Sequence, residues 1–292
     1  MKQNYFKTIT VAIVSGVSFF VVVAFLLSNF FAGDIVMKQN FHIGPLSLQY
    51  YGLLIAIAGT AGYFLAQSRR KLIGISTNEA DTIILVLVVL GFVGARLYHV
   101  VSELPYYFSE PAQIFAVWNG GLSIYGAMVG GFVAILVCYK YFLKAPEKFS
   151  VWQVLDWLVP SLALGQIIGR FGNFVNYEIY GTPTRLLWKM FVPEQFRSSP
   201  YELNSFFHPL FLYESAASVI ILVLLLKLKV KPGALFLTWL FLYNIVRFLL
   251  EQIRVGSVMY GGVRVNALVS LALCAVAVLF YFKYVKPNSQ SN

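Results

Sequence analysis

Charged residues are scarce in this chain. They make up 12% of its 292 residues, against roughly 25% in an average globular protein, and the mean hydropathy is +0.74. This composition excludes a soluble domain of the same length, whose surface would carry more charge. Several apolar runs reach the ~20 residues with which a helix crosses a bilayer. The sequence therefore indicates an all-α integral membrane protein.

Cysteine and histidine are also rare. Both cysteines, Cys138 and Cys274, lie within apolar runs, and no C-x-x-C pair occurs. That excludes a disulfide framework and the usual zinc motifs. The three histidines stand far apart, without H-E-x-x-H spacing, so we expect no metal site.

The apolar runs predict eight transmembrane helices. Their approximate ranges are 8–31, 50–67, 81–101, 121–143, 151–170, 209–226, 233–252 and 265–284. The first run could be a signal peptide, but it is too long and Asn29–Ala32 is a poor cleavage site, which favours an uncleaved anchor. We expect residues 1–40 to form this extra anchor and its linker, residues 41–286 a membrane core, and residues 287–292 a disordered tail.

Lysine and arginine predict the orientation of the helices. Eight alternating spans would bring thirteen basic residues to one side: Lys2, Lys7, Arg69, Arg70, Lys71, Lys140, Lys144, Lys148, Lys227, Lys229, Lys231, Lys283 and Lys286. Since cytoplasmic loops are enriched in such residues, we expect both termini in the cytoplasm. The net charge of +10 is then a topology signal. Basic residues scattered over short loops form no single nucleic-acid-binding face.

One long polar insertion, at 171–208, separates two of the spans. Irregular backbone does not face lipid, so this segment must lie outside the bilayer or line a cavity. The predicted topology puts it on the external side. We expect a small extracytoplasmic arm or cap there, with a short helix near 185–196.

Polar residues from separate spans are predicted to lie at one depth. At about 1.5 Å per residue, Arg96 and Arg247 lie roughly 20 Å from the inner ends of their helices. Arg170 lies at the outer end of its own span, and Tyr51 and Glu214 open theirs from the outside. The outer third of the bilayer is therefore the expected place of a site.

The span at 233–252 carries a polar face. Tyr243, Arg247, Glu251 and Arg254 are spaced by four, four and three residues, which brings them to one side of a helix. Such a face must point into the bundle or a wet cavity. It could be only an internal Arg247–Glu251 pair with Arg254 at the interface. Together with Arg170 it favours a site for a phospholipid phosphate, whose oxygens suit the guanidinium fork.

Glycines accompany this polar pattern. Gly126, Gly130 and Gly131 are expected to let helices approach closely, and Gly120-Gly121 to form a turn. Gly172 and Gly181 bracket Asn173 and Asn176, so the backbone should leave regular helix there. Both asparagines could donate to a phosphate or ester, or could satisfy the irregular backbone.

Seven ordered motifs, covering about residues 41 to 284, resemble the prolipoprotein diacylglyceryl transferase family. They are Tyr50-Tyr51-Gly52, Gly94-Ala95-Arg96, the GGLSIYG of 120–126, Asp156 with Pro160, the GRFGNFVNYEIYG of 169–181, His208-Pro209 with Tyr213-Glu214, and Arg247-x-x-x-Glu251-x-x-Arg254. The extra first span lies outside the family's usual seven-helix core. At 263–266 the chain has Val-Arg-Val-Asn where the family has a Met-Gly-Gln-type turn, which leaves a polar role for Asn266 unsupported.

The resemblance implies a function in the bacterial cytoplasmic (inner) membrane, with the active site toward the outer leaflet. The family transfers the diacylglyceryl group of phosphatidylglycerol to the lipobox cysteine of a prolipoprotein, forming a thioether and releasing glycerol 1-phosphate. No cofactor is implied. A transporter or flippase for a lipid or anionic solute is the alternative, but the repeated halves typical of many transporters are not evident.

The resemblance also implies roles for individual residues. It makes Arg170, Arg247, Tyr125, Glu178 and Asn173 the catalytic candidates. The phosphatidylglycerol-binding candidates are Arg170, Asn173, Asn176, Gly181, Tyr51, Arg247, Glu251, Tyr243, His208, Glu214 and Arg254. Many members carry a histidine, a proposed base, at the position of Tyr125. An unperturbed tyrosine with a pKa of ~10 is a poor base, so Glu178, Glu214 and His208 stay open as proton acceptors.

Overall fold

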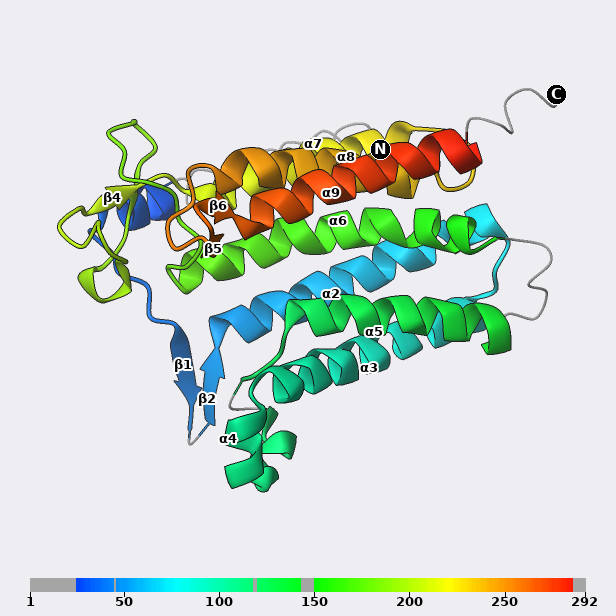
Figure 1. The fold of residues 1–292 in the computed structure, drawn as a ribbon, viewed down its shortest axis with the longest axis horizontal. Helices are drawn as coiled ribbons and strands as arrows, with labels where there is room; N and C mark the ends of the chain where they lie inside the picture. Colours follow the sequence, from blue (N-terminus) through cyan, green and yellow to red (C-terminus); the bar gives the residue numbers. More distant parts are fainter. Residues whose placement is uncertain (1–24, 45, 118–119, 143–149, 286–292) are drawn as a thin grey trace, which may run out of the picture. The chain divides into compact units, whose positions relative to one another are not determined.

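The computed structural model describes residues 25–44, 46–117, 120–142 and 150–285, mostly as helices (Figure 1). In that part of the chain, seven helices are long and apolar enough to span a bilayer. They are α2 (Tyr50–Arg69), α3 (Thr77–Ser102), α5 (Ile124–Val137), α6 (Val151–Val175), α7 (Leu210–Lys227), α8 (Ala234–Glu251) and α9 (Val265–Phe280). The spans of α2, α5 and α9 include the 3₁₀ or π-helical turn that continues each helix. The all-α membrane fold and seven of the predicted spans are thereby confirmed. The first predicted span lies mostly outside the described residues, as does the predicted tail at 287–292.

Short elements join the long helices. Within the described residues, three two-stranded antiparallel sheets pair β1 (Asn40–Ile43) with β2 (Leu46–Gln49), β3 (Met190–Phe191) with β4 (Phe206–Phe207), and β5 (Met259–Tyr260) with β6 (Val263–Arg264). Helix α4 (Leu104–Ser109) and the 3₁₀ turns η1 (Arg70–Ile73), η2 (Pro111–Phe115) and η6 (Glu194–Phe196) lie in loops. The π-helical turns η4 (Cys138–Phe142) and η7 (Tyr281–Val285) follow α5 and α9. The helix predicted near 185–196 is thus reduced to η6, because residues 190–191 pair as a strand instead.

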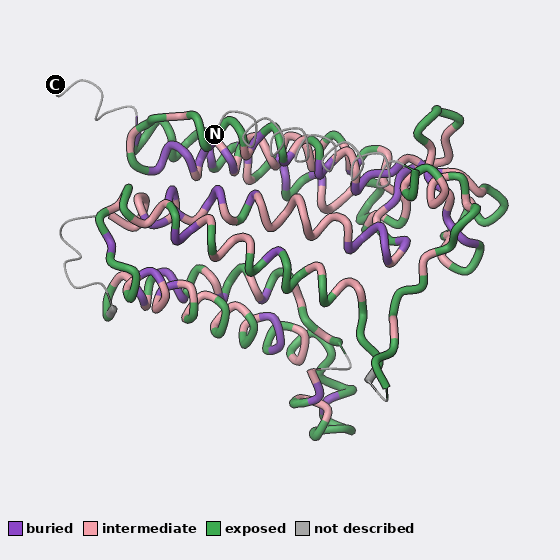
Figure 2. The backbone as a smooth tube through the Cα atoms, turned by 180° about the vertical axis from the view of Figure 1, so that it is seen from behind, coloured by how far each residue is buried: buried purple, intermediate pink, exposed green. Residues whose placement is uncertain are grey.

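The chain divides into two compact units. Of the described residues, the first contains those up to 57, at 166–219 and at 243–274, and the second contains those at 58–165, at 220–242 and from 275 onward. Figure 2 shows exposed and partly exposed residues along the helices of both units. An apolar exposed surface is expected where a helix faces lipid.

Glycines set the spacing of α3 and α5 in the second unit. A Cβ on Gly94 would lie 3.0 Å from the Cα of Gly130, and one on Gly126 would overlap the carbonyl of Gly94. Close approach is therefore confirmed at Gly126 and Gly130. It is wrong for Gly131, which has open space where a Cβ would be. The predicted turn is confirmed, since Gly120 and Gly121 have φ of 89° and 74°.

Arg96 stabilises the loop before α5. Its buried guanidinium donates to the carbonyls of Ile114 at 3.0 Å, Gly120 at 2.7 Å and Gly121 at 2.8 Å, and also to that of Gln113. Irregular backbone at membrane depth needs such partners. The depth estimate grouped Arg96 with the other arginines, but its donors serve the backbone of the second unit.

Aromatic residues hold the arm at 171–208 within the first unit. Phe174 stacks on Phe211 with ring centroids 4.7 Å apart, and Tyr180 packs on Phe207 at the same distance. Both pairs belong to one buried cluster. The ends of α6 and α7 therefore share a core with the arm, which fixes the polar residues next to them.

Candidate functional site

The backbone beyond α6 is strained on both sides of Glu178. Tyr177 and Ile179 adopt left-handed conformations, with φ of 53° and 54°, and each such non-glycine residue costs about 1–2 kcal/mol. Two hydrogen bonds hold the segment: Met37 N–H donates to the Tyr177 hydroxyl at 2.8 Å, and Val255 N–H donates to the Tyr180 carbonyl at 3.0 Å. Burial raises the pKa of the Tyr177 hydroxyl. The carboxylate of Glu178 is consequently presented from a fixed loop, with its side chain exposed.

Asn173 joins Arg170 to Glu178. The Arg170 Nη1 donates to Asn173 Oδ1 at 3.1 Å, and Asn173 Nδ2 donates to Glu178 Oε1 at 2.8 Å. Both the oxygen and the nitrogen of the buried Asn173 amide are thereby hydrogen-bonded. The three residues lie in or just after the last turns of α6, and the asparagine separates the cation from the carboxylate.

Glu214 connects arginines from two other helices. Its Oε2 accepts from Nη1 of Arg247 in α8 at 2.8 Å, and its Oε1 forms an ion pair with Nη2 of Arg170 in α6. Tyr243 adds to the cluster, because its hydroxyl accepts from Arg170 Nη2 and donates to Glu214 Oε1, each at 2.7 Å. Helices α6, α7 and α8 therefore meet at one buried carboxylate.

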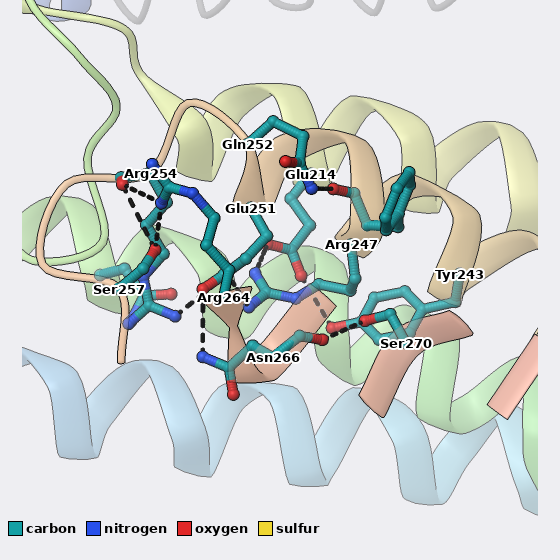
Figure 3. A network of polar contacts seen from close by, with 12 residues as sticks. Glu214, Tyr243, Arg247, Glu251, Gln252, Arg254, Ser257, Arg264, Asn266 and Ser270 are labelled. Carbon is teal, nitrogen blue, oxygen red and sulfur yellow. Dashed lines mark hydrogen bonds and ion pairs between the residues drawn. The ribbon is translucent and has the colours of Figure 1, made fainter. Parts of the chain in front are cut away.

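Glu251 forms a second node, shown in Figure 3. Its Oε2 pairs with Arg247 at 3.4 Å and with Arg254 at 3.3 Å, while its Oε1 accepts from Asn266 Nδ2 at 3.1 Å. The predicted face of α8 is thus a continuous network, and it includes the internal Arg247–Glu251 pair that the sequence offered as the structural alternative. Asn266 belongs to it, a role that sequence comparison with the family motif missed. Asn266 is the second residue of α9. This place at the start of a membrane helix is the feature of the sequence that could have predicted its role.

Burial separates the anions from the cations. The side chains of Glu214 and Glu251 are each 1% exposed, whereas those of Arg170, Arg247 and Arg254 are 16–20% exposed. Removing one partner of a buried pair is costly, so the carboxylates fix the guanidinium groups strongly. Three guanidinium groups face two buried carboxylates and keep part of their surface accessible, while Asn173 lies between Arg170 and the exposed carboxylate of Glu178. Such an accessible guanidinium surface suits a phosphate, which arginine binds in bidentate fashion.

Other predicted binding residues lie around this cluster. A Cβ on Gly172 would overlap the ring of Tyr51, and Gly181 N–H donates to the His208 carbonyl at 2.9 Å. The Nδ1 of His208 lies 3.1 Å from the Tyr213 hydroxyl, and burial lowers the pKa of its ring. The Asn176 carbonyl accepts from Gln39 Nε2 at 3.3 Å. The first unit therefore brings together all the predicted site residues except Tyr125.

Tyr125 belongs to the second unit. It is the second residue of α5, its side chain is 51% exposed, and its ring centroid lies 6.0 Å from that of Tyr98. Arg96 anchors the loop that precedes α5. The ring is accessible, as a reacting group must be. Among the described residues, no cluster of three histidine, cysteine, aspartate or glutamate side chains could hold a metal ion.

Comparison with known proteins identifies the family of the chain. The family model for "Prolipoprotein diacylglyceryl transferase" matches residues 38–283. The chain belongs to the prolipoprotein diacylglyceryl transferase family. It is accordingly an enzyme and a multi-pass membrane protein.

Relatives from several bacteria match this transferase over most of their length. The phosphatidylglycerol–prolipoprotein diacylglyceryl transferase of Thermotoga maritima is 39% identical over 260 residues, 87% of each chain. Those of Synechococcus elongatus (39% identical, 81% of this chain and 83% of the relative) and Staphylococcus aureus (35% identical, 85% and 89%) are similar. The matched region of the transferase contains all seven described spans and both glutamate nodes.

Proposed function

We propose that this transferase moves the diacylglyceryl group from phosphatidylglycerol to the cysteine thiol of a prolipoprotein, the first step of lipoprotein maturation. One observation carries the proposal: Arg170 and Arg247, from different helices, converge on Glu214 and keep part of their guanidinium surface accessible. The names of the relatives supply the substrates. The site supplies a cationic edge for the phosphate of such a lipid.

The reaction is a substitution at the glycerol carbon that bears the phosphate. The thiolate sulfur attacks this carbon, a C–S bond forms and the C–O bond to phosphate breaks. Glycerol 1-phosphate leaves with the electron pair, so negative charge increases on the phosphate. Fixed positive donors that hold this charge in the transition state accelerate the step. Arg170 and Arg247 have this role in our proposal.

Glu214 and Tyr243 position those arginines. Neither Glu214 nor Glu251 is accessible to a ligand at 1% exposure, so their contribution to lipid binding acts through the guanidinium groups. Tyr243 receives one hydrogen bond from Arg170 and gives one to Glu214. A phosphate can then bind to donors whose orientation is already set, which lowers the cost of organising the site.

Glu178 is our candidate for the proton acceptor. The attacking group is the thiolate, so the thiol proton must pass to a base. Glu214 is buried between two arginines, whereas Glu178 is exposed and oriented by Asn173. Tyr125, at the position where the family often has histidine, is the competing candidate. Lipidation by Glu178→Gln and by Tyr125→Phe distinguishes them, because the variant that lacks the base loses activity while the other keeps it.

We also propose that the site faces the outer leaflet, with both termini in the cytoplasm. The site residues gather at the C-terminal ends of α6 and α8 and at the N-terminal ends of α2, α7 and α9. The opposite ends of α2 and α7 carry basic residues, with Arg69 and Lys227 in their last turns. This alternation supports the orientation that positive charges favour.

A reconstituted lipidation assay tests the proposed function. Purified protein, phosphatidylglycerol and a lipobox peptide should yield a thioether-linked peptide and an equal amount of glycerol 1-phosphate. Arg170→Ala and Arg247→Ala should abolish product although the protein still inserts into the membrane. Arg70→Ala, at the opposite end of the spans, should keep activity and serves as the control. Absence of product from the wild type under conditions in which a relative is active would overturn the proposal.

A further inference from the structure

A turn at the edge of the arm exposes apolar side chains between two basic residues. The turn has the sequence Arg-Leu-Leu-Trp-Lys at 185–189 and is closed by a hydrogen bond from Lys189 N–H to the Leu186 carbonyl at 3.1 Å. Leu187 is 99% exposed, and Leu186 and Trp188 are 40% and 49% exposed. Turns in water usually carry glycine, asparagine, aspartate or serine. An exposed apolar cluster of this kind marks a contact with another apolar phase.

A tether holds the turn beside the end of a membrane helix. The indole Nε1 of Trp188 donates to the hydroxyl of Tyr213 at 2.7 Å. Tyr213 is the fourth residue of α7, which begins at Leu210. At 1.5 Å per residue, this is about 4.5 Å along the helix from its start. The turn therefore lies near the level at which α7 enters the bilayer.

The composition of the turn matches the membrane interface. Tryptophan is enriched where the headgroups meet the acyl chains, and basic residues close to the surface are attracted to anionic lipids. Arg185 is exposed, and the Nζ of Lys189 lies 4.2 Å from the ring centroid of Phe206. Leucines between such flanks are positioned to enter the acyl region. The flanking charges favour a lipid surface over an apolar peptide as the occupant.

We propose that the turn formed by residues 185–189 inserts into the leaflet at the N-terminal end of α7. Leu186 and Leu187 enter the acyl chains, while Arg185, Trp188 and Lys189 remain among the headgroups of anionic lipid. This contact would fix the arm to the membrane surface. It goes beyond the proposed reaction and does not depend on it, since it uses none of the residues assigned to the chemistry.

The arm contains a matched control residue. Leu203 is 97% exposed and also lies in a turn, which is closed by Asn204 N–H and the Tyr201 carbonyl at 3.0 Å. Its neighbour Glu202 is acidic. The carbonyl of Glu202 accepts from Arg197 at 3.0 Å, so this turn is tied to the arm itself. We expect Leu203 to stay in water.

Spin labels at the two leucines test the proposal. Leu187→Cys and Leu203→Cys are made with Cys138 and Cys274 replaced by alanine, labelled, and placed in nanodiscs of phosphatidylcholine and phosphatidylglycerol. The label at 187 should be relaxed by oxygen at least several-fold more than by a water-soluble nickel chelate, and the label at 203 should show the reverse. Equal access of the chelate to both labels would overturn the proposal. If the label at 187 were protected from the chelate only after lipobox peptide is added, the proposal would also be overturned, and the turn would be a peptide-docking surface instead.

A label-free measurement covers the case in which the cysteine variants misfold. Brominated lipids quench tryptophans that lie close to them. The difference between wild type and Trp188→Phe isolates the emission of Trp188, and that emission should be quenched by lipid brominated near the headgroup end of its chains. An emission from Trp188 that brominated lipid leaves unchanged would contradict insertion.

Discussion

Arg247 donates to Glu214 across two helices, with 2.8 Å between Nη1 and Oε2, and Glu214 is 1% exposed. The same carboxylate binds Arg170. A single buried anion on α7 therefore sets the distance between two cations, one on α6 and one on α8. This relationship explains how residues 170 and 247 can act on one phosphate.

Removing the charge of Glu214 should impair catalysis. Glu214→Gln keeps the shape but loses two charge-assisted bonds, each of which contributes about 1.5–3 kcal/mol. We expect kcat to fall roughly 10- to 100-fold, because both guanidinium groups lose their fixed positions. Steady-state lipidation rates measure the effect. Ser218→Ala, on the same helix, is the control and should retain nearly full activity.

Lysine should not replace Arg247. The guanidinium contacts Glu214 with Nη1 and Glu251 with Nη2, and an ammonium group cannot reproduce that planar fork. We expect Arg247→Lys to lose at least about tenfold in kcat/KM, as for one lost charged hydrogen bond. Arg254→Lys, which removes a contact with Glu251 only, should lose less. Equal losses would argue against a special position of Arg247.

Gly172 should not tolerate a side chain, because the ring of Tyr51 occupies the space. Gly172→Ala would displace this ring and should lower lipidation several-fold. Gly165→Ala is the matched comparison in the same helix, since a Cβ there meets nothing within 4 Å. That variant should be neutral, or stabilised by up to about 1 kcal/mol from helix propensity. Activity and thermal unfolding of both variants provide the check.

The left-handed conformation of Ile179 should lower the stability of the folded protein. Ile179→Gly and Ile179→Ala both remove the side chain beyond Cβ, but only glycine, which lacks Cβ as well, adopts φ of 54° without cost. The glycine variant should be more stable than the alanine variant by about 1 kcal/mol. Thermal unfolding in detergent measures the difference. If alanine proved the more stable of the two, the loop would not carry this strain.

His208 should make folding sensitive to acid. Burial lowers the pKa of its ring below the usual 6.5, so the folded state binds this proton less readily than the unfolded state does. Stability is then lost as the pH falls below about 6.5, and it is retained above that value. His208→Gln should reduce the pH dependence of the unfolding temperature between pH 5 and 7. An unchanged slope would assign the sensitivity to other groups.

Helix positions and much of the site followed from periodicity and depth. Apolar runs predicted the seven described spans, and the spacing of Tyr243, Arg247 and Glu251 predicted a shared polar face. Both signals are local. They need only the helix repeat and the cost of charge in lipid.

Partner choice could not be predicted in the same way. The bilayer depth estimated from helix position grouped Arg96 with the other arginines, whereas its guanidinium donates to backbone carbonyls. The departure from the family motif at 263–266 left a polar role for Asn266 unsupported, yet Asn266 donates to Glu251. Gly131 was expected to pack closely and faces open space. Each outcome depends on which group of another segment is nearby, and this information lies in tertiary packing.

Binding of glycerol 1-phosphate is the most direct test of the central claim that Arg170 and Arg247 hold the phosphate. Calorimetry on the purified protein in detergent would compare the wild type with Arg170→Gln, Arg247→Gln and Arg70→Gln. We predict saturable binding by the wild type and Arg70→Gln, and affinities weaker by about tenfold or more for the other two, as expected for a lost charged hydrogen bond. Equal affinity in all four proteins would contradict the account.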